Sequence, residues 1–219
     1  MENNIKSMKI NRLKKAGIFL VVGAVGLVAM SFTNIFKNKD ADYVAIKKCT
    51  LTPDEIRAEE SKKAFLKAYK VFMHPRCMNC HPNGDVPLQG DDSHPHLQNV
   101  QRGPDGKGLY AMKCKNCHQD ANLQAKNSVP GNPHWQMPPA NRPMVFQGKT
   151  PKQLAIHFKD NQFTGFKSLN DMIKHVDEES LVISSFNPPA GVTKIPMSHE
   201  EFVGAVKEWI AKGAAIPDK

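Results

Sequence analysis

Two five-residue motifs constrain this chain more than any other feature. Residues 77–81 read CMNCH and residues 114–118 read CKNCH, and the pattern Cys-x-x-Cys-His is typical of covalent attachment of a c-type haem. In such a motif the two thiols add across the two vinyl groups of one porphyrin, and the histidine binds the iron from one side. We therefore expect two covalent haems c, held by four thiols with two proximal histidines: Cys77, Cys80 and His81, and Cys114, Cys117 and His118.

Paired cysteines have two other common uses, which we keep as alternatives. Zinc ribbons usually separate their two pairs by about 15–20 residues, whereas 33 residues lie between Cys80 and Cys114. A thioredoxin-like redox pair needs a βαβ setting, which the neighbouring proline, glycine and aspartate residues do not predict. The added histidine in both motifs favours haem over either alternative.

Composition and charge limit the remaining possibilities. A chain of 219 residues allows one domain plus a tail, or two small domains. With only 7% aromatic residues, the side-chain core is modest, so haem would supply much of the buried apolar surface. The net charge is +9, of which residues 1–37 carry +5. The remaining +4 would be nearly cancelled by four haem propionates, so we expect no nucleic-acid binding.

The N-terminal region carries an export signal. Residues 16–36, AGIFLVVGAVGLVAMSFTNIF, form an apolar run of 21 residues preceded by five basic residues. About 20 residues span a bilayer, and basic flanks stay in the cytoplasm. We predict an inner-membrane anchor over residues 1–37, a linker over 38–51 and a periplasmic dihaem domain over 52–219. A cleaved signal peptide, releasing a soluble periplasmic or secreted protein, is the alternative, because residues 29–31 form a small-x-small site.

Helix-capping patterns predict an all-α domain with long irregular loops. Thr52-Pro53 begins a helix that should end near His74, because Pro75 favours extended geometry before it. Capping patterns begin further helices at Thr150, Ser168 and Ser198. The loops between the motifs, and from the second motif to about Gly148, show little periodicity, and we see no strand alternation.

The sixth iron position is usually filled by Met or His in electron-transfer proteins. We predict His96, in the inter-motif loop, for the first haem and Met137, in the segment WQMPP, for the second. The alternatives are His94 and Met112 for the first haem, and Met144 and His175 for the second. Arg76, Arg102 and Arg142 are either propionate partners or solvated surface charges.

The two motifs make this chain resemble c-type cytochromes. Its wider stretches resemble a narrower group, the dihaem cytochrome-like proteins often named isoquinoline 1-oxidoreductase subunits, which accompany molybdenum hydroxylases. This resemblance covers roughly residues 70–215 and rests on HPRCMNCHPNGDVPLQGDD, VQRGPDGKG, MKCKNCHQDAN and GNPHWQMPP. It implies a small cytochrome c-like domain through which electrons pass from a partner dehydrogenase or molybdenum hydroxylase to a respiratory acceptor.

These observations favour an electron-transfer protein over an enzyme. The chain has no molybdopterin or iron–sulfur motif, since only Cys49 remains after the four motif cysteines, so catalysis would belong to the partner. A dihaem peroxidase and a haem-based sensor are the alternatives, and both require an open iron position.

Overall fold

The computed structural model of this chain describes residues 51–219. The predicted anchor or signal segment, residues 38–50 of the predicted linker, and Cys49 lie outside the described residues. Both motifs lie in one compact unit, residues 54–219. Within residues 51–219, no helix combines the length and the apolar character needed to cross a bilayer.

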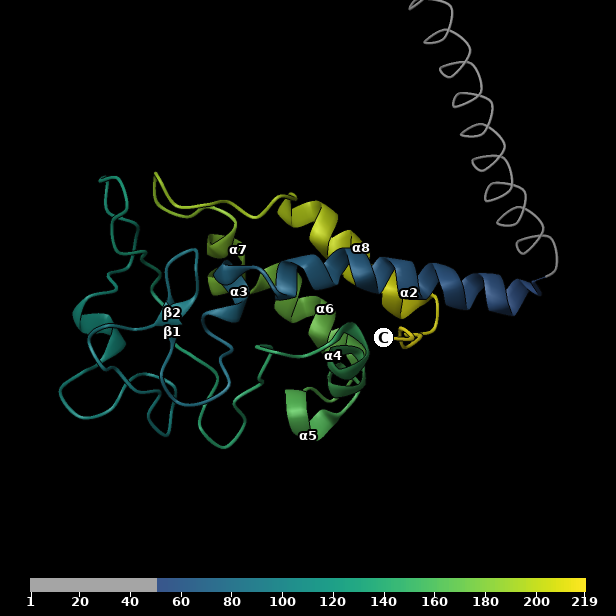
Figure 1. Cartoon of the computed structure of the whole chain (residues 1–219), viewed down its shortest axis with the longest axis horizontal. Helices are drawn as coiled ribbons and strands as arrows, with labels where there is room; N and C mark the ends of the chain where they lie inside the picture. Colours follow the sequence, from purple (N-terminus) through teal and green to yellow (C-terminus); the bar gives the residue numbers. More distant parts are fainter. Residues whose placement is uncertain (1–50) are drawn as a thin grey trace, which may run out of the picture. The chain divides into compact units, whose positions relative to one another are not determined.

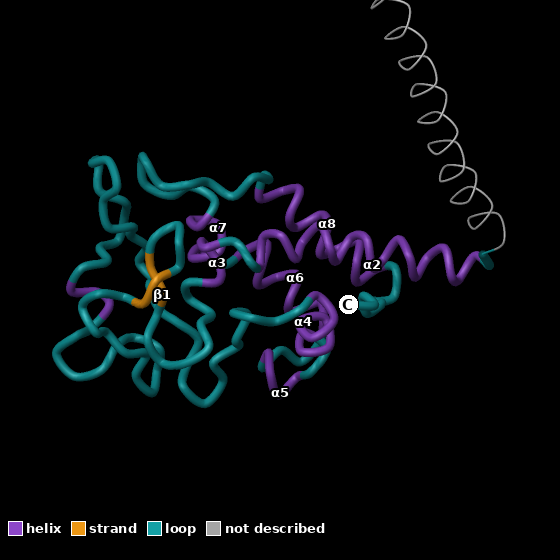
Figure 2. Tube along the Cα trace, in the orientation of Figure 1, coloured by secondary structure: helices purple, strands orange, loops and turns teal. Residues whose placement is uncertain are grey.

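The described unit is mostly helical (Figures 1 and 2). Its longer helices gather at one end, and its long loops, with two short strands and one short helical turn, lie at the other. In chain order the elements are α2 (Pro53–Phe72), α3 (Pro75–Met78), β1 (Leu88–Gln89), β2 (His94–Pro95), η1 (Cys114–Asn116), α4 (Pro151–Phe158), α5 (Asn161–Thr164), α6 (Leu169–Glu178), α7 (Ser180–Ser185) and α8 (His199–Ala211).

The core forms where α2 packs against α8. The ring of Phe65 lies 4.8 Å from that of Trp209, and the ring of Phe72 lies 5.2 Å from that of Phe202. Ser61 is fully buried between them. Its hydroxyl donates to the carbonyl of Trp209 at 2.8 Å and accepts from the amide of Ala215 at 3.0 Å, so no polar group is left unpaired there.

The predicted helix starts are confirmed. The Thr150 hydroxyl accepts from the amide of Gln153, whose side chain accepts from the Thr150 amide in return. The same reciprocal pairing begins α8 at Ser198, and α6 begins with a capping box at Ser168. The helix that begins at Pro53 ends at Phe72, two residues before the predicted end.

The loop end matches the predicted irregular segments except for one small ladder. From residue 79 to 150 the only helical element is η1. The strands β1 and β2 pair antiparallel, with Leu88 opposite Pro95 and Gln89 opposite His94, and this pairing was not predicted. Two-residue strands are too short for an alternating pattern to show in a sequence. Gly90, at φ 75°, begins the turn between them.

Candidate haem site

The first motif begins at the short helix α3, directly after the long helix α2. Pro75 occupies the first turn, and the Nδ1 atom of His74 accepts a hydrogen bond from the amide of Arg76 at 3.2 Å. Further turns follow, in which the Cys80 amide donates to the Cys77 carbonyl and the His81 amide donates to the Met78 carbonyl. These consecutive turns hold the two thiols and the imidazole close together at the end of α2.

The second motif is built on the 3₁₀ turn η1. The amides of Cys117 and His118 both donate to the carbonyl of Cys114, at 3.2 and 2.9 Å. The glycine-rich segment before it, residues 103–108, is tightly folded. Gly106 has φ 79°, and a Cβ atom there would collide with the carbonyl oxygen of Met137. Only glycine fits this position without moving the Met137 loop.

A downstream segment, residues 144–147, holds the imidazole of His81. Its Nδ1 lies 2.8 Å from the carbonyl oxygen of Met144, and its ring stacks on Phe146 with centroids 3.8 Å apart and planes 3° apart. Because a carbonyl oxygen can only accept, Nδ1 carries the proton. The lone pair of Nε2 is therefore free to bind a metal, which is the usual arrangement of a metal-binding histidine.

The second histidine is held in the same way by residues 130–135. His118 Nδ1 donates to the carbonyl of Pro130 at 2.7 Å, and the ring stacks on Trp135 with centroids 3.9 Å apart and planes 9° apart. Both motif histidines thus have a fixed ring orientation and a free Nε2. This repeated arrangement was not predicted, because the two carbonyls are backbone groups of loops that carry no sequence signature.

Burial of the motif side chains shifts the pKa values of their imidazoles and thiols, and it favours the neutral form of both groups. Burial lowers the pKa of His81 to about 3 and also lowers the pKa of His118, so both imidazoles are neutral, as metal binding requires. Burial raises the pKa of the Cys77 thiol to about 12 and that of Cys80 to about 11. Redox-active cysteine pairs need a lowered thiol pKa, so this environment does not favour the redox alternative.

The two motifs border one cavity of about 650 Å³. Asn79 and Cys80 of the first motif line it together with Cys114, Cys117 and His118 of the second. The two motifs also interact electrostatically. After burial, the nearby Cys114 thiol is the next cause of the raised pKa of Cys80. The folded chain therefore brings the two motifs side by side, although 33 residues separate them in the sequence.

The residues around this cavity fit a haem. The four motif cysteines are free thiols, which thioether attachment requires. Three cavity-lining residues, Arg76, Asn79 and His96, each have a buried side-chain nitrogen or oxygen without a hydrogen-bond partner in the described part of the chain. Buried polar atoms are normally paired, so these atoms indicate a group that completes the site. A bound haem would supply an iron that exchanges one electron at a time.

Three of the predicted distal residues line this cavity. The ring of His96 lies 6.5 Å from that of His118, with the ring planes 65° apart. His96, predicted for the first haem, thus lies beside the second motif, in a cavity that both motifs line. Met137, predicted for the second haem, is buried and lines the same cavity. Met112 also lines it, with 44% of its surface exposed.

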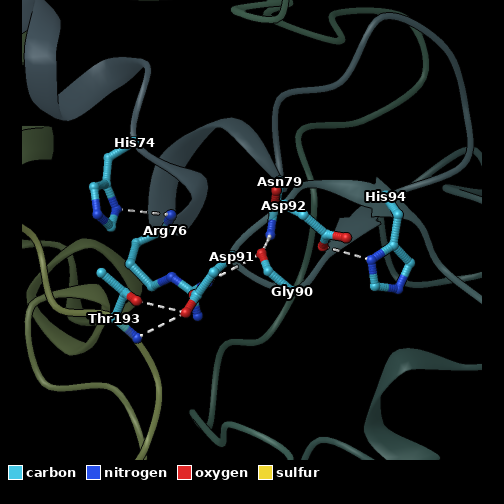
Figure 3. Close-up of polar contacts among 8 residues, drawn as sticks. All are labelled: His74, Arg76, Asn79, Gly90, Asp91, Asp92, His94 and Thr193. Carbon is cyan, nitrogen blue, oxygen red and sulfur yellow. Dashed lines mark hydrogen bonds and ion pairs between the residues drawn. The ribbon is translucent and has the colours of Figure 1, made fainter.

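The other three distal candidates have different surroundings. His94 uses both ring nitrogens, contacting Asp92 at 2.6 Å and Gln89 at 3.0 Å, and Figure 3 shows its contact with Asp92. Met144 supplies the carbonyl that fixes His81, which places its backbone on the Nδ1 side of that ring. His175, an alternative for the second haem, acts electrostatically on the first motif: after burial, it also lowers the pKa of His81.

Arg102 has a structural role that the sequence did not indicate. Its side chain is fully buried and bridges two loops: it donates to the carbonyls of Pro138 and Gly84 at 2.8 and 2.7 Å and contacts Asp85 at 3.3 Å. Because Asp85 follows the first motif and Pro138 follows Met137, this guanidinium joins the two sides of the site. It is therefore neither a surface charge nor a free partner for a propionate.

Arg76 connects the first motif to the C-terminal part of the chain through Asp91 (Figure 3). Its guanidinium lies 2.6 Å from one Asp91 carboxylate oxygen and donates to the Gly90 carbonyl at 3.1 Å. The second Asp91 oxygen accepts from the hydroxyl and the amide of Thr193, at 2.6 and 3.1 Å. The loop before α8 is thereby tied to the motif, and its residues Gly191 and Val192 line the cavity.

Zinc binding requires three or four ligands that converge on one point. Among residues 51–219, no group of three or more histidine, cysteine or acidic side chains has that arrangement. The zinc alternative therefore has no support from the described geometry.

Comparisons with protein-family models, curated proteins and solved structures gave no match to this chain.

Proposed function

We propose that this chain is a dihaem c-type cytochrome that transfers electrons and carries no catalytic activity of its own. The observation that supports this most strongly is the repeated arrangement of the motif histidines. His81 and His118 each donate Nδ1–H to a loop carbonyl and stack on an aromatic ring, which leaves Nε2 free beside a pair of free thiols. A haem c needs this combination of donors.

The residues around each motif would orient the cofactor and tune it. The carbonyls of Met144 and Pro130 hold the two imidazoles and raise their basicity as ligands. The shared cavity between Cys80 and Cys114 would keep the two haems close, and a short separation suits electron transfer between them. Burial of the site from water is a second means by which the chain would set the reduction potentials.

The cellular setting is part of the same proposal. The apolar run over residues 16–36 with its basic flank supports a membrane-anchored protein with the haem domain on the periplasmic side, where c-type haems are attached. The resemblance to dihaem subunits that accompany molybdenum hydroxylases supports a partner dehydrogenase or molybdenum hydroxylase as electron donor. A respiratory carrier would then be the acceptor.

Optical titration of the full-length chain, expressed with c-haem maturation machinery, tests the proposal. We expect both haems to be low-spin in the oxidised and reduced states, to take up and release one electron each reversibly, and to be unaffected by carbon monoxide. Carbon monoxide binding together with turnover of peroxide would contradict the electron-transfer proposal and favour a peroxidase. Carbon monoxide binding without peroxide turnover would favour the haem-based sensor.

A further inference from the structure

The ring spacing between His96 and His118 suggests how the second iron is held. Their centroids are 6.5 Å apart. A histidine nitrogen binds a metal at about 2 Å, so two imidazoles that each bind one iron through a ring nitrogen, from opposite sides, have centroids roughly 6 Å apart. The observed separation of the two rings is therefore compatible with a shared iron.

One ring nitrogen of His96 lacks a hydrogen-bond partner among the described residues. This atom, Nδ1, is buried and unpaired, whereas buried polar atoms are normally paired. The Gln98 side chain is a hydrogen-bonding neighbour of the imidazole. By contrast, both ring nitrogens of His94, two residues before His96, have partners. His96 lines the same cavity as Cys114 and Cys117.

Met137 is the competing ligand in this cavity. Its burial is explained without a metal, because it is an apolar residue with 5% of its surface exposed. Its amide donates to the carbonyl of Gly106 at 2.9 Å, so its backbone is fixed by the glycine-rich segment before the second motif. Burial of an apolar side chain is the ordinary state of methionine, whereas a buried imidazole nitrogen without a partner is unusual.

We propose that His96 is the sixth ligand of the haem attached at Cys114 and Cys117, which gives that iron two histidine ligands, His118 and His96. This inference rests on the proposed function and extends it. Histidine in place of methionine lowers the reduction potential of a haem. The second haem would therefore be a low-potential centre, and Met137 would pack against it without binding the iron.

The test uses the full-length protein matured with two covalent haems, studied by electron paramagnetic resonance and by the near-infrared sulfur-to-iron band. The variants are His96→Ala, Met137→Leu and the matched control His94→Ala. We expect His96→Ala to turn one of the two haems high-spin and open to carbon monoxide, and added imidazole to restore the low-spin signal. Met137→Leu and His94→Ala should leave both haems low-spin.

A second variant separates loss of the iron ligand from loss of folding in His96→Ala. His96→Met keeps a ligand at the site, so we expect a new sulfur-to-iron band and a higher reduction potential for one haem. A high-spin haem in Met137→Leu but not in His96→Ala would overturn the inference while leaving the proposed function intact. Fewer than two covalent haems in the wild-type chain would overturn the proposed function, and the inference with it.

Discussion

At the scale of single residues, the site depends on backbone groups that a sequence does not display. The motif spacing predicts which side chains are thiols and which imidazoles are proximal. It does not predict that the carbonyls of Met144 and Pro130 fix these imidazoles, since Met144 lies 63 residues from His81. The sequence likewise does not show which motif His96 approaches, because its loop has no periodicity.

Arg102 is the residue whose surroundings differ most from its predicted ones. A lysine can replace its charge but not its three-way hydrogen bonding, because an ammonium group lacks the planar fork of a guanidinium. In Arg102→Lys all N–H donors would sit on one nitrogen, which cannot replace the three separate guanidinium nitrogens that contact Asp85, Pro138 and Gly84. We expect this variant to lose about 1–3 kcal/mol of unfolding free energy, measured by urea unfolding of the haem-loaded protein.

The matched control for this variant is Arg57→Lys. Arg57 makes an exposed ion pair with Asp54, with 63% of the arginine side chain accessible, and exposed pairs of this kind contribute little. We expect a change below about 0.5 kcal/mol. Equal losses in the two variants would contradict the bridging part assigned to Arg102.

At the scale of elements, local chemistry predicted the four longest helices, α2, α4, α6 and α8, but not the short helices α3, α5 and α7. Thr150 and Ser198 begin helices because their hydroxyls accept from amides within the same turn. At Ser168 the Asp171 carboxylate accepts from the Ser168 amide and hydroxyl. Such pairs are readable from neighbouring residues. The β1–β2 ladder and the tie between Asp91 and Thr193 were not predicted. The tie joins residues 102 positions apart, and nothing in the intervening sequence indicates it.

The Asp91 tie predicts a local effect of acid. The hydrogen bond from the Thr193 hydroxyl is the main cause that lowers the pKa of Asp91, with smaller contributions from the Thr193 amide and the nearby Arg76 and His74. A carboxyl group whose folded pKa is lowered stabilises the fold above its ordinary pKa of about 3.9 and loses that contribution as the pH falls through the folded value. The loop should therefore loosen in acid.

Hydrogen exchange at the Thr193 amide measures this loosening. We expect its protection factor to fall as the pH drops below the ordinary Asp range, while amides in α2 and α8 stay protected. Asp91→Asn keeps an acceptor oxygen but cannot titrate, so protection of Thr193 should become independent of pH over this range. Protection that is constant in the wild-type chain, or falls equally in the Asn variant, would contradict the assignment.

At the scale of the whole molecule, the helical end and the loop end (Figure 2) differ in how far the sequence could predict them. The helical end follows from apolar residues such as Phe65, Phe202 and Trp209, whose spacing marks buried helix faces. The loop end has few such residues, and its arrangement depends on turns, buried arginine contacts and glycines with positive φ. The proximity of the two motifs arises in this second part.

The covalent haem content of the mature chain tests the central claim most directly. We would measure the mass of the denatured full-length protein, together with its pyridine haemochrome spectrum, after expression with c-haem maturation machinery. The account predicts two covalently attached haems per chain, and one in the paired variant Cys114→Ser with Cys117→Ser. A wild-type chain that carries no covalent haem, or a zinc ion in its place, would contradict the account.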